Sequence, residues 1–423
     1  MPTHRHGLTR RAALTAAPAF TLAIASRSPA AGLTADDFVA RLPERLQAGG
    51  VPGVSWALIE RGELRHLGAW GFANLATRQP LRADTLLGTA SVTKTFTATL
   101  LMQQVERGRC GLDDPAAQHL PFALRHPAHP EVPLTLRHLL THSSGLADPS
   151  AAYAASYACG DPALSLEAWL REALHGEAAR AQPPFHADAP GQRHAYSNVG
   201  YGLLGLVLQQ LTSRSYAQLL REDLLQPLGM ARSCVLLGEL SPEAQAHELA
   251  TPYEQLAPGK ALAPPVDRLA QGAPMPFAEG QHQALCPYSF ATVSDGLLRS
   301  SATEMARFAL ALLQGGELEG RRILRAPTLA LMWSDQLAAL PATQRPRYQQ
   351  GLAWRGLGDA NAASPAPTPA PARYWAHFGS DPGTAAALTV RPQDGRGLVM
   401  LSNGARARPL LGRLSVEWMA AGR

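Results

Sequence analysis

The sequence predicts an α/β domain whose strands come from both ends of the chain, with a largely helical region inserted between them. Two segments read as β-hairpins, because short apolar runs flank residues that favour turns. One hairpin spans 53–70 with its turn at Arg61-Gly62, and the other spans 385–402 with its turn at 392–395. Between the hairpins, apolar residues recur at helical spacing. Strands at both ends with helices between them favour one domain that both termini complete.

The change of pattern along the chain sets the expected division of this domain. We expect a sheet domain formed by about 35–90 and 290–423, with the helical region at about 95–290. The clearest helical patterns cover 94–108, 201–212 and 302–313. A tract of proline and alanine at 362–371 is interpreted as a surface loop, because strand-like segments lie on both sides of it.

Composition allows a large buried core and argues against nucleic-acid binding. Of 423 residues, 46% are apolar and only 17% are charged, which is typical of a globular protein. The formal net charge is +5, but the first thirty residues carry four arginines and no acidic residue. The remaining chain is therefore near +1, which is too low for the basic surface that nucleic acids require.

Residues 1–30 are interpreted as a secretion signal of the twin-arginine type, which leaves 31–423 as the mature domain. Arg10-Arg11 precedes a weakly apolar stretch, and small residues suited to cleavage follow it. A disordered basic tail is the alternative. No later run reaches about 18 uninterrupted apolar residues, so we expect no transmembrane segment and an exported bacterial protein, periplasmic or extracellular.

Four cysteines become eligible for disulfides if the protein is exported: Cys110, Cys159, Cys234 and Cys286. Four cysteines allow three complete pairings, and the sequence does not choose among them. None forms a C-x-x-C pair or a zinc-like cluster, so buried free thiols are the expectation for most of them.

Ser91 and Lys94 are the first candidate catalytic pair. Their spacing of three residues at the start of a helical pattern places both side chains on one helix face. A serine hydroxyl needs a partner that accepts its proton, and a lysine does so only in its neutral form, which burial favours. The chain has 36 arginines and two lysines, so a lysine here indicates a position where deprotonation matters. A helix N-cap serine with a solvated lysine is the structural alternative.

Two further motifs carry matching chemistry. Tyr196 and Asn198 lie two residues apart before a helical pattern, so Tyr196 is expected to relay a proton and Asn198 to orient a substrate amide. His377 and Gly379 alternate on one face of a predicted strand, where a glycine lets the backbone approach a substrate closely. The amides of Ser91 and Ser380 are then the expected oxyanion hole.

The order S-x-x-K, Y-x-N, H-x-G resembles the serine β-lactamase and D,D-peptidase superfamily, in particular its class C-like branch. The similarity extends over most of 35–405. It includes the segments 88–101, 139–146, 190–206 and 296–316. The resemblance implies an antiparallel sheet flanked by helices with an inserted helical domain, and a site in the cleft between them. It also implies an acyl-enzyme on Ser91, with no metal or organic cofactor.

The resemblance leaves the substrate open. The branch includes β-lactamases, D-alanyl-D-alanine carboxypeptidases, D-amino-acid peptidases and esterases, so the partner is a small molecule or peptide, such as a peptidoglycan stem peptide or an ester. His377 stands where β-lactamases of this branch usually have a lysine, which looks more like the peptidases. Phe378 replaces a hydroxyl that often helps to hold a substrate carboxylate. We therefore predict weak or absent β-lactamase turnover.

Three other functions are weighed against the serine hydrolase. His138 and His142 have the spacing of a helical metal pair, with His119, His126 and His129 nearby, but the glutamate of H-E-x-x-H is missing. No serine lies in G-x-S-x-G, which disfavours an α/β-hydrolase, although a carboxylesterase acting through Ser91 stays open. The rival of another class is a non-catalytic cell-wall-binding homologue.

Overall fold

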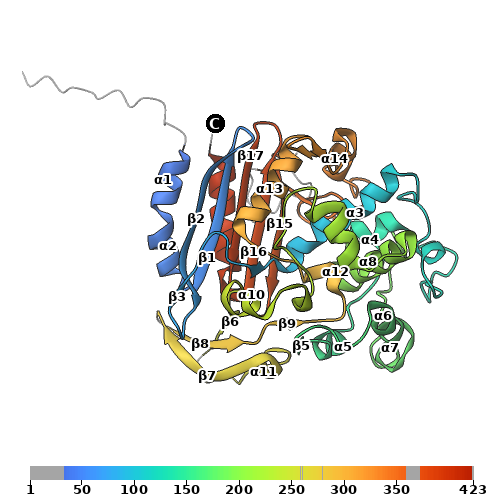
Figure 1. Cartoon of the computed structure of the whole chain (residues 1–423). Helices are drawn as coiled ribbons and strands as arrows, with labels where there is room; N and C mark the ends of the chain where they lie inside the picture. The colour runs from blue at the N-terminus through green and yellow to red at the C-terminus, as the bar shows by residue number, and fades with distance from the viewer. Residues whose placement is uncertain (1–32, 258, 260, 279, 359–371, 422–423) are drawn as a thin grey trace, which may run out of the picture. The chain divides into compact units, whose positions relative to one another are not determined.

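An antiparallel sheet of eight strands forms the centre of the computed structural model of the chain (Figure 1). The strand order is β13-β14-β15-β16-β17-β1-β2-β3. The bounds are β1 (Gly53–Glu60), β2 (Glu63–Asn74), β3 (Gln79–Pro80), β13 (Gln349–Gln350), β14 (Arg355–Leu357), β15 (Tyr374–Asp381), β16 (Thr384–Arg391) and β17 (Arg396–Ser402). All neighbouring pairs are antiparallel, as expected.

The structure describes residues 33–257, 259, 261–278, 280–358 and 372–421. Two segments with sequence-based predictions lie outside these described residues, the predicted signal 1–30 and the proline and alanine tract 362–371. Lys260, the second of the two lysines, also lies outside them.

Both predicted hairpins are confirmed, and they are joined edge to edge. The turn between β1 and β2 uses Arg61 and Gly62, both with positive φ, and β16 turns into β17 through Gly395. Strand β17 pairs with β1, with Val54 opposite Ser402. This pairing joins segments almost 350 residues apart, so the two ends of the domain complete one sheet.

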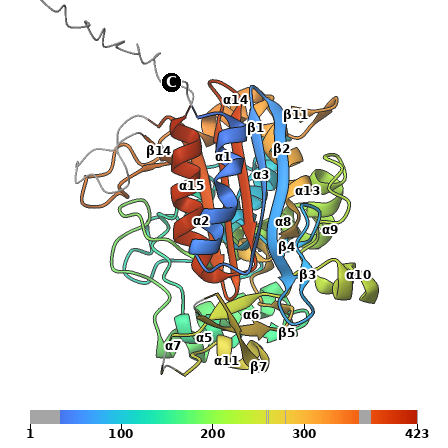
Figure 2. The same ribbon diagram turned by 90° about the vertical axis from the view of Figure 1, so that its left-hand side faces the viewer.

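The central strands are apolar on both faces, because successive side chains point alternately into two different hydrophobic clusters. In β1, Ala57 and Ile59 belong to one hydrophobic cluster, whereas Trp56 and Leu58 belong to a second. The helices α1 (Ala35–Ala40), α2 (Leu42–Ala48) and α15 (Arg408–Ala420) cover the second face (Figure 2). On the first face α13 (Ala302–Leu313) packs against the strands, and α3 (Thr93–Glu106) and α8 (Asn198–Thr212) belong to the same hydrophobic cluster. These three helices match the predicted ones.

In the sequence, most of the remaining helices and short strands come between α3 and β13. The helices are α4 (Leu136–Leu140), α5 (Ser150–Ala155), α6 (Leu166–His175), α7 (Glu177–Ala181), α9 (Tyr216–Leu220), α10 (Pro242–His247), α11 (Val266–Leu269), α12 (Val293–Gly296) and α14 (Ala326–Met332). The strands are β4 (Leu87–Gly88), β5 (Ala158–Cys159), β6 (Tyr253–Gln255), β7 (Ala270–Phe277), β8 (Gly280–Leu285), β9 (Tyr288–Ser289), β10 (Arg299–Ser300), β11 (Glu317–Leu318) and β12 (Arg321–Arg322). Strands β6, β8 and β7 form a small separate sheet that the helical patterns did not predict.

One disulfide joins Cys159 at the end of β5 to Cys286 just before β9. Cys110 and Cys234 are buried free thiols, and burial raises the pKa of each to about 11. The expectation of free thiols therefore holds for two of the four cysteines. No helix within the described ranges has the length and hydropathy of a membrane span.

Candidate active site

Ser91 lies in a 3₁₀ turn, η1 (Ala90–Val92), directly before α3. Its neighbour Ala90 has φ of 46°, a left-handed conformation that costs a residue with a side chain roughly 1–2 kcal/mol. The Thr93 hydroxyl donates to the Ala90 carbonyl at 2.7 Å and holds the turn in place. Such strained turns gather at functional sites, where surrounding structure maintains them.

Lys94 is completely buried, and its Nζ points at the predicted nucleophile. Nζ donates to Asn198 Oδ1 and to the Asp295 carbonyl, each at 2.8 Å, and lies 3.4 Å from Ser91 Oγ. In the neutral form that proton transfer requires, the amine has two N–H donors for the first two acceptors and a lone pair for the Ser91 proton. Asn198 thus contacts Lys94 directly, in addition to its expected role toward a substrate.

Tyr196 completes the group around Ser91. Its hydroxyl donates to Ser91 Oγ at 3.0 Å, and its ring lies 5.1 Å from Lys94 Nζ. The following residue, Ser197, is the N-cap of α8, and the Asp148 carboxylate accepts from the Ser197 hydroxyl and from the first amides of the helix. This cap fixes the entry of α8 and therefore the position of Tyr196.

His142 supports Tyr196 from behind and was missed in this role. The two rings are stacked with centroids 4.2 Å apart, and His142 Nδ1 accepts from the Ser197 amide at 3.2 Å. Burial lowers the pKa of His142 well below its usual value, which keeps the ring neutral and leaves Nδ1 free to accept. Its spacing from His138 had indicated only a metal ligand.

Strand β15 forms the opposite wall, and Gly379 is where it comes closest to the nucleophile. A Cβ on Gly379 would lie 2.4 Å from the Thr89 carbonyl and 3.1 Å from the Ser91 amide, so only glycine fits. Strand β14 pairs only with residues 374–376 of β15. Beyond Ala376, this edge of β15 does not pair with β14. Ser380, whose amide is the predicted oxyanion donor, is exposed on this part of the strand.

His377 is buried on the same face of β15 as Gly379. Its Nδ1 donates to the Ala353 carbonyl at 2.5 Å, and burial lowers its pKa well below the usual value. The ring is therefore neutral with its proton on Nδ1. Its Nε2 is a buried acceptor without a hydrogen-bond partner among the described residues.

Asp295 is a carboxylate at the site that the sequence analysis missed. Both of its oxygens accept from the Tyr153 hydroxyl, at 2.9 and 3.0 Å, and Oδ1 lies 3.9 Å from Lys94 Nζ. Burial raises its pKa to about 6, although the Lys94 charge and the hydrogen bonds oppose this. The only available signal was a charged residue inside an otherwise small and apolar segment, 293–298.

A surface groove of ≈ 630 Å³ lies between β14, β15 and α15, and Arg355 and Arg408 are among its lining residues. The Arg355 guanidinium lies 5.9 Å from the Tyr196 ring, and that of Arg408 lies 4.3 Å from the Phe378 ring. Within the described residues, neither arginine has an acidic partner. Burial and the charge of Arg355 lower the pKa of Arg408 to about 10. Neither arginine belongs to a motif, so nothing in the sequence marked them.

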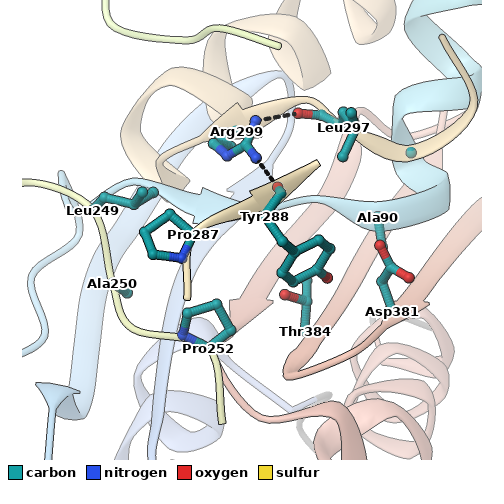
Figure 3. Close-up of a pocket in the computed structure, with 12 residues that line it drawn as sticks. Ala90, Leu249, Ala250, Pro252, Pro287, Tyr288, Leu297, Arg299, Asp381 and Thr384 are labelled. Atoms are coloured by element: carbon teal, nitrogen blue, oxygen red, sulfur yellow. Dashed lines mark hydrogen bonds between the residues drawn. The ribbon is translucent and has the colours of Figure 1, made fainter. Parts of the chain in front are cut away.

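A second, smaller cavity of ≈ 40 Å³ lies next to Ala90 (Figure 3). Asp381 and Thr384 line it from the main sheet, and Tyr288 and Arg299 line it from the inserted region. Ala90 precedes Ser91, but Ser91 itself is not among the lining residues of this cavity or of the groove.

The five histidines of the metal hypothesis have structural partners instead. His138 Nδ1 accepts from the Thr135 amide in the cap of α4, and His119 contacts Asp114. His126 and His129 donate to the carbonyls of His186 and Ala187. No group of three potential ligands suited to a metal ion occurs in the part of the chain that the structure describes.

Comparison with known proteins gives one consistent relationship. The family model described as Beta-lactamase matches residues 36–414. Penicillin-binding protein 4 of Amycolatopsis lactamdurans is 27% identical over 86% of each chain. The D-aminopeptidase of Brucella anthropi is 32% identical over 52% of this chain, and penicillin-binding protein 4* of Bacillus subtilis is 29% identical over 44%. These two alignments cover only 38% and 39% of the relatives' own lengths.

Solved structures agree on the fold. A D-amino acid amidase from Ochrobactrum anthropi SV3 superposes with a TM-score of 0.68 at 22% identity, covering 90% of this chain and 97% of the amidase. EstCE1, described as a hydrolase with promiscuous acyltransferase activity, gives a TM-score of 0.67 at 22% identity, over 91% of this chain and 97% of its own. At this level of identity the likeness establishes the fold and leaves the substrate open.

Proposed function

Because the chain belongs to the beta-lactamase family and is a serine hydrolase, we propose that it removes a carboxylate-bearing leaving group, such as a C-terminal D-amino acid, through an acyl-enzyme on Ser91. In this proposal Lys94 and Tyr196 move protons, Asn198 and His377 orient the substrate, and the amides of Ser91 and Ser380 bind the oxyanion. The activity expected is that of a D-alanyl-D-alanine carboxypeptidase or a related peptidase.

Each step follows from the contacts around Ser91 Oγ. Oγ attacks the substrate carbonyl while its proton passes to the amine of Lys94 in its neutral form, and a tetrahedral intermediate forms. The bond between carbon and nitrogen then breaks, and Tyr196 gives a proton to the departing amine. A water molecule attacks the resulting ester, loses a proton to the Lys94 and Tyr196 pair and releases the acid, which restores the Ser91 hydroxyl.

The observation that supports a carboxylate-bearing leaving group is the pair Arg355 and Arg408. The Arg355 guanidinium lies 5.9 Å from the ring of Tyr196, the group that would protonate the leaving amine, so a carboxylate on the leaving group would be near this charge. A partly buried arginine without an acidic partner is costly unless a ligand supplies the anion. Glu417, the one acidic side chain of this groove, is paired with Arg45 instead. A planar guanidinium suits a carboxylate, which offsets the missing hydroxyl at Phe378.

A carboxylesterase is the second candidate, and the same groove favours it for a different reason. Leu357, Phe378, Pro409 and Val416 give the groove a largely apolar lining. An apolar alcohol would find hydrophobic contact there. The similarity to the fold of EstCE1 is compatible with this alternative.

Hydrolysis of matched donors separates these candidates. The peptide N-acetyl-D-alanyl-D-alanine, the same peptide with a C-terminal amide, and an aryl ester are compared by kcat/KM, with intact mass spectrometry of the enzyme to detect acylation. We expect the acid to be preferred about tenfold or more over the amide, and Arg355→Gln or Arg408→Gln to remove that preference. Fast ester hydrolysis without a carboxylate preference would favour the esterase. Full activity of Ser91→Ala would exclude the mechanism, whereas no turnover of any of these donors by the native protein would favour the non-catalytic binding homologue.

We further infer that the protein is exported, with residues 1–30 as its signal and 31–423 as the mature domain. The disulfide between Cys159 and Cys286 supports this, because disulfides persist mainly in oxidising compartments. A mass spectrum of the secreted protein that begins near residue 31 and includes the disulfide is the expected result. A protein that keeps its first thirty residues in the cytoplasm would contradict it.

A further inference from the structure

Asp295 contacts the predicted base Lys94 in two ways, and only one of them requires an aspartate. Its main-chain carbonyl accepts from Lys94 Nζ at 2.8 Å, a contact that other residues at this position would also supply. Its carboxylate adds a charge, because Oδ1 lies 3.9 Å from the same Nζ. Helix α12, which carries Asp295, packs against α3, which carries Lys94, and against α8 (Figure 1). The side chain of Asp295 therefore does more than the main-chain bond that holds Lys94.

The Asp295 carboxylate is buried and is held by the hydroxyl of Tyr153 on α5. That hydroxyl lies 2.9 and 3.0 Å from the two carboxylate oxygens, so it fixes their position opposite Lys94. Burial raises the pKa of Asp295 to about 6, against the charge of Lys94 and the hydrogen bonds from Thr292 and Tyr153. At neutral pH the carboxylate is nevertheless mainly ionised, so a negative charge faces Nζ.

The charge of Asp295 acts on the proton that moves between Ser91 and Lys94. An anion at this distance favours the ammonium form of a lysine over its neutral amine. The proposed acylation turns the neutral amine into an ammonium, because the amine takes the proton of Ser91. Since both Lys94 and Asp295 are buried, water screens their interaction little. The carboxylate therefore stabilises the product of the proton transfer, and it also makes the neutral amine rarer in the resting enzyme.

We propose that Asp295 is a positioning residue that acts through Lys94, and that its carboxylate makes the amine a stronger base while raising the pH at which this base becomes available. The inference rests on the proposed acyl-enzyme at Ser91. The proton passes from Ser91 Oγ to Lys94 Nζ, and Asp295 stays ionised throughout. Because a general base becomes more effective as its basicity increases, loss of the charge should slow acylation while extending it to lower pH. A role in packing alone would slow acylation without moving its pH range.

The other titratable groups around this pair decide which control is needed. Burial raises the pKa of three nearby tyrosines and lowers the pKa of two nearby histidines, so none of the five changes charge near neutral pH; they are Tyr153, Tyr201, Tyr216, His142 and His377. Tyr196 bonds to Ser91 Oγ, and Asp148 caps α8. Asp381 differs from these groups, because burial raises its pKa to about 7, within the range of the test.

The pH dependence of acylation tests the proposal. The probe is p-nitrophenyl acetate, whose phenolate leaves without needing a proton, so its rate reports the removal of the proton from Ser91. We measure kcat/KM from about pH 5 to pH 10 for the native enzyme and for Asp295→Asn. This variant keeps the main-chain bond to Lys94 and an acceptor for Tyr153. We expect the acidic limb of its profile to shift to lower pH by about 1–3 units and its plateau to fall about tenfold.

Two further variants separate the charge of Asp295 from its packing. Tyr153→Phe removes the hydrogen bond to Asp295 but keeps the carboxylate, so its acidic limb should shift less than that of Asp295→Asn. Asp381→Asn is the matched control, because it also removes a carboxylate bonded to a tyrosine. Among the described residues Lys94 has its ion-pair contact with Asp295 and none with Asp381, so the control should keep the native limb.

Thermal unfolding of each variant checks that it folds. An acidic limb that coincides in Asp295→Asn and the native enzyme would overturn the proposal, whether or not the plateau falls. An equal shift in Asp381→Asn would also overturn it, because the effect would then not depend on the contact with Lys94. Failure of the acyl-enzyme itself would appear separately, as hydrolysis of the ester that survives in Ser91→Ala.

Discussion

The hydroxyl of Tyr196 donates a hydrogen bond of 3.0 Å to Oγ of Ser91, from a ring that is stacked on neutral His142. The bond places the phenol between the nucleophile and the groove that holds Arg355. A proton taken from Ser91 therefore has a short path to a leaving amine. The geometry predicts that Tyr196 matters for bond cleavage more than for binding.

Tyr196→Phe is expected to lower kcat about 10²- to 10⁴-fold with little change in KM, because it removes a group that transfers protons and keeps the ring on His142. Stopped-flow or burst kinetics with a chromogenic ester would show slow acylation. Tyr216→Phe is the control, since it also removes a buried hydroxyl bonded to a threonine, Thr97, on α3. A kcat that falls less than tenfold would assign the proton transfer to Lys94 alone.

Phe378 is expected to limit the reaction with β-lactams. Its ring lies under Arg408 where a hydroxyl would assist carboxylate binding, so the native enzyme should form penicillin adducts slowly or not at all. Phe378→Thr should acylate faster than Phe378→Val, which has the same shape without a hydroxyl. Intact mass spectrometry over time measures both rates. Rapid cephalosporin turnover by the native protein would contradict the prediction.

The catalytic group could be predicted from sequence because its members lie in short motifs on regular elements. Ser91 and Lys94 are one turn apart, and Tyr196 and Asn198 adjoin the cap of α8. Once these two segments are recognised, packing α3 against α8 is enough to bring Lys94 into contact with Asn198. The sheet could also be predicted, because alternate apolar side chains in β1 and β17 define two buried faces.

The arginines that would select a substrate could not be predicted in this way. Arg355 lies on a three-residue strand, and Arg408 begins the last helix. Their relation depends on how β14, β15 and α15 meet in space, and the chain has 36 arginines among which sequence alone cannot choose. His142 shows the same limit, because its spacing from His138 resembles a metal pair while its actual partners are Tyr196 and Ser197.

The disulfide is expected to stabilise the fold appreciably. Cys159 and Cys286 are 127 residues apart, so the bond closes a long loop of the unfolded chain, and α5 with Tyr153 lies just before Cys159. Replacing both cysteines with serine should lower the free energy of unfolding by about 2–4 kcal/mol. Urea unfolding with and without dithiothreitol measures this, and the double variant should no longer respond to the reductant. Cys110→Ser serves as the control for loss of a buried thiol.

The raised pKa of Asp381 predicts how stability changes with pH. Burial raises this pKa from its usual 3.8 to about 7 in the folded protein, so the folded state binds the proton more tightly than the unfolded chain. The contribution of this proton to stability is complete below pH 4 and is lost as pH rises through 7. Asp381→Asn does not titrate, so its free energy of unfolding relative to the native protein should rise by about 2–4 kcal/mol between pH 4 and pH 8.

Asp394 provides a control of opposite sign, because the hydrogen bonds and charge of Arg391 hold its pKa below the usual value despite partial burial. Its ionised form stabilises the fold above pH 4, so Asp394→Asn should lose stability relative to the native protein as pH rises from 3 to 6. Urea unfolding at several pH values follows both variants in one experiment. A constant offset between Asp381→Asn and the native protein across this range would contradict the prediction, because it would mean that folding does not raise the pKa of this carboxyl.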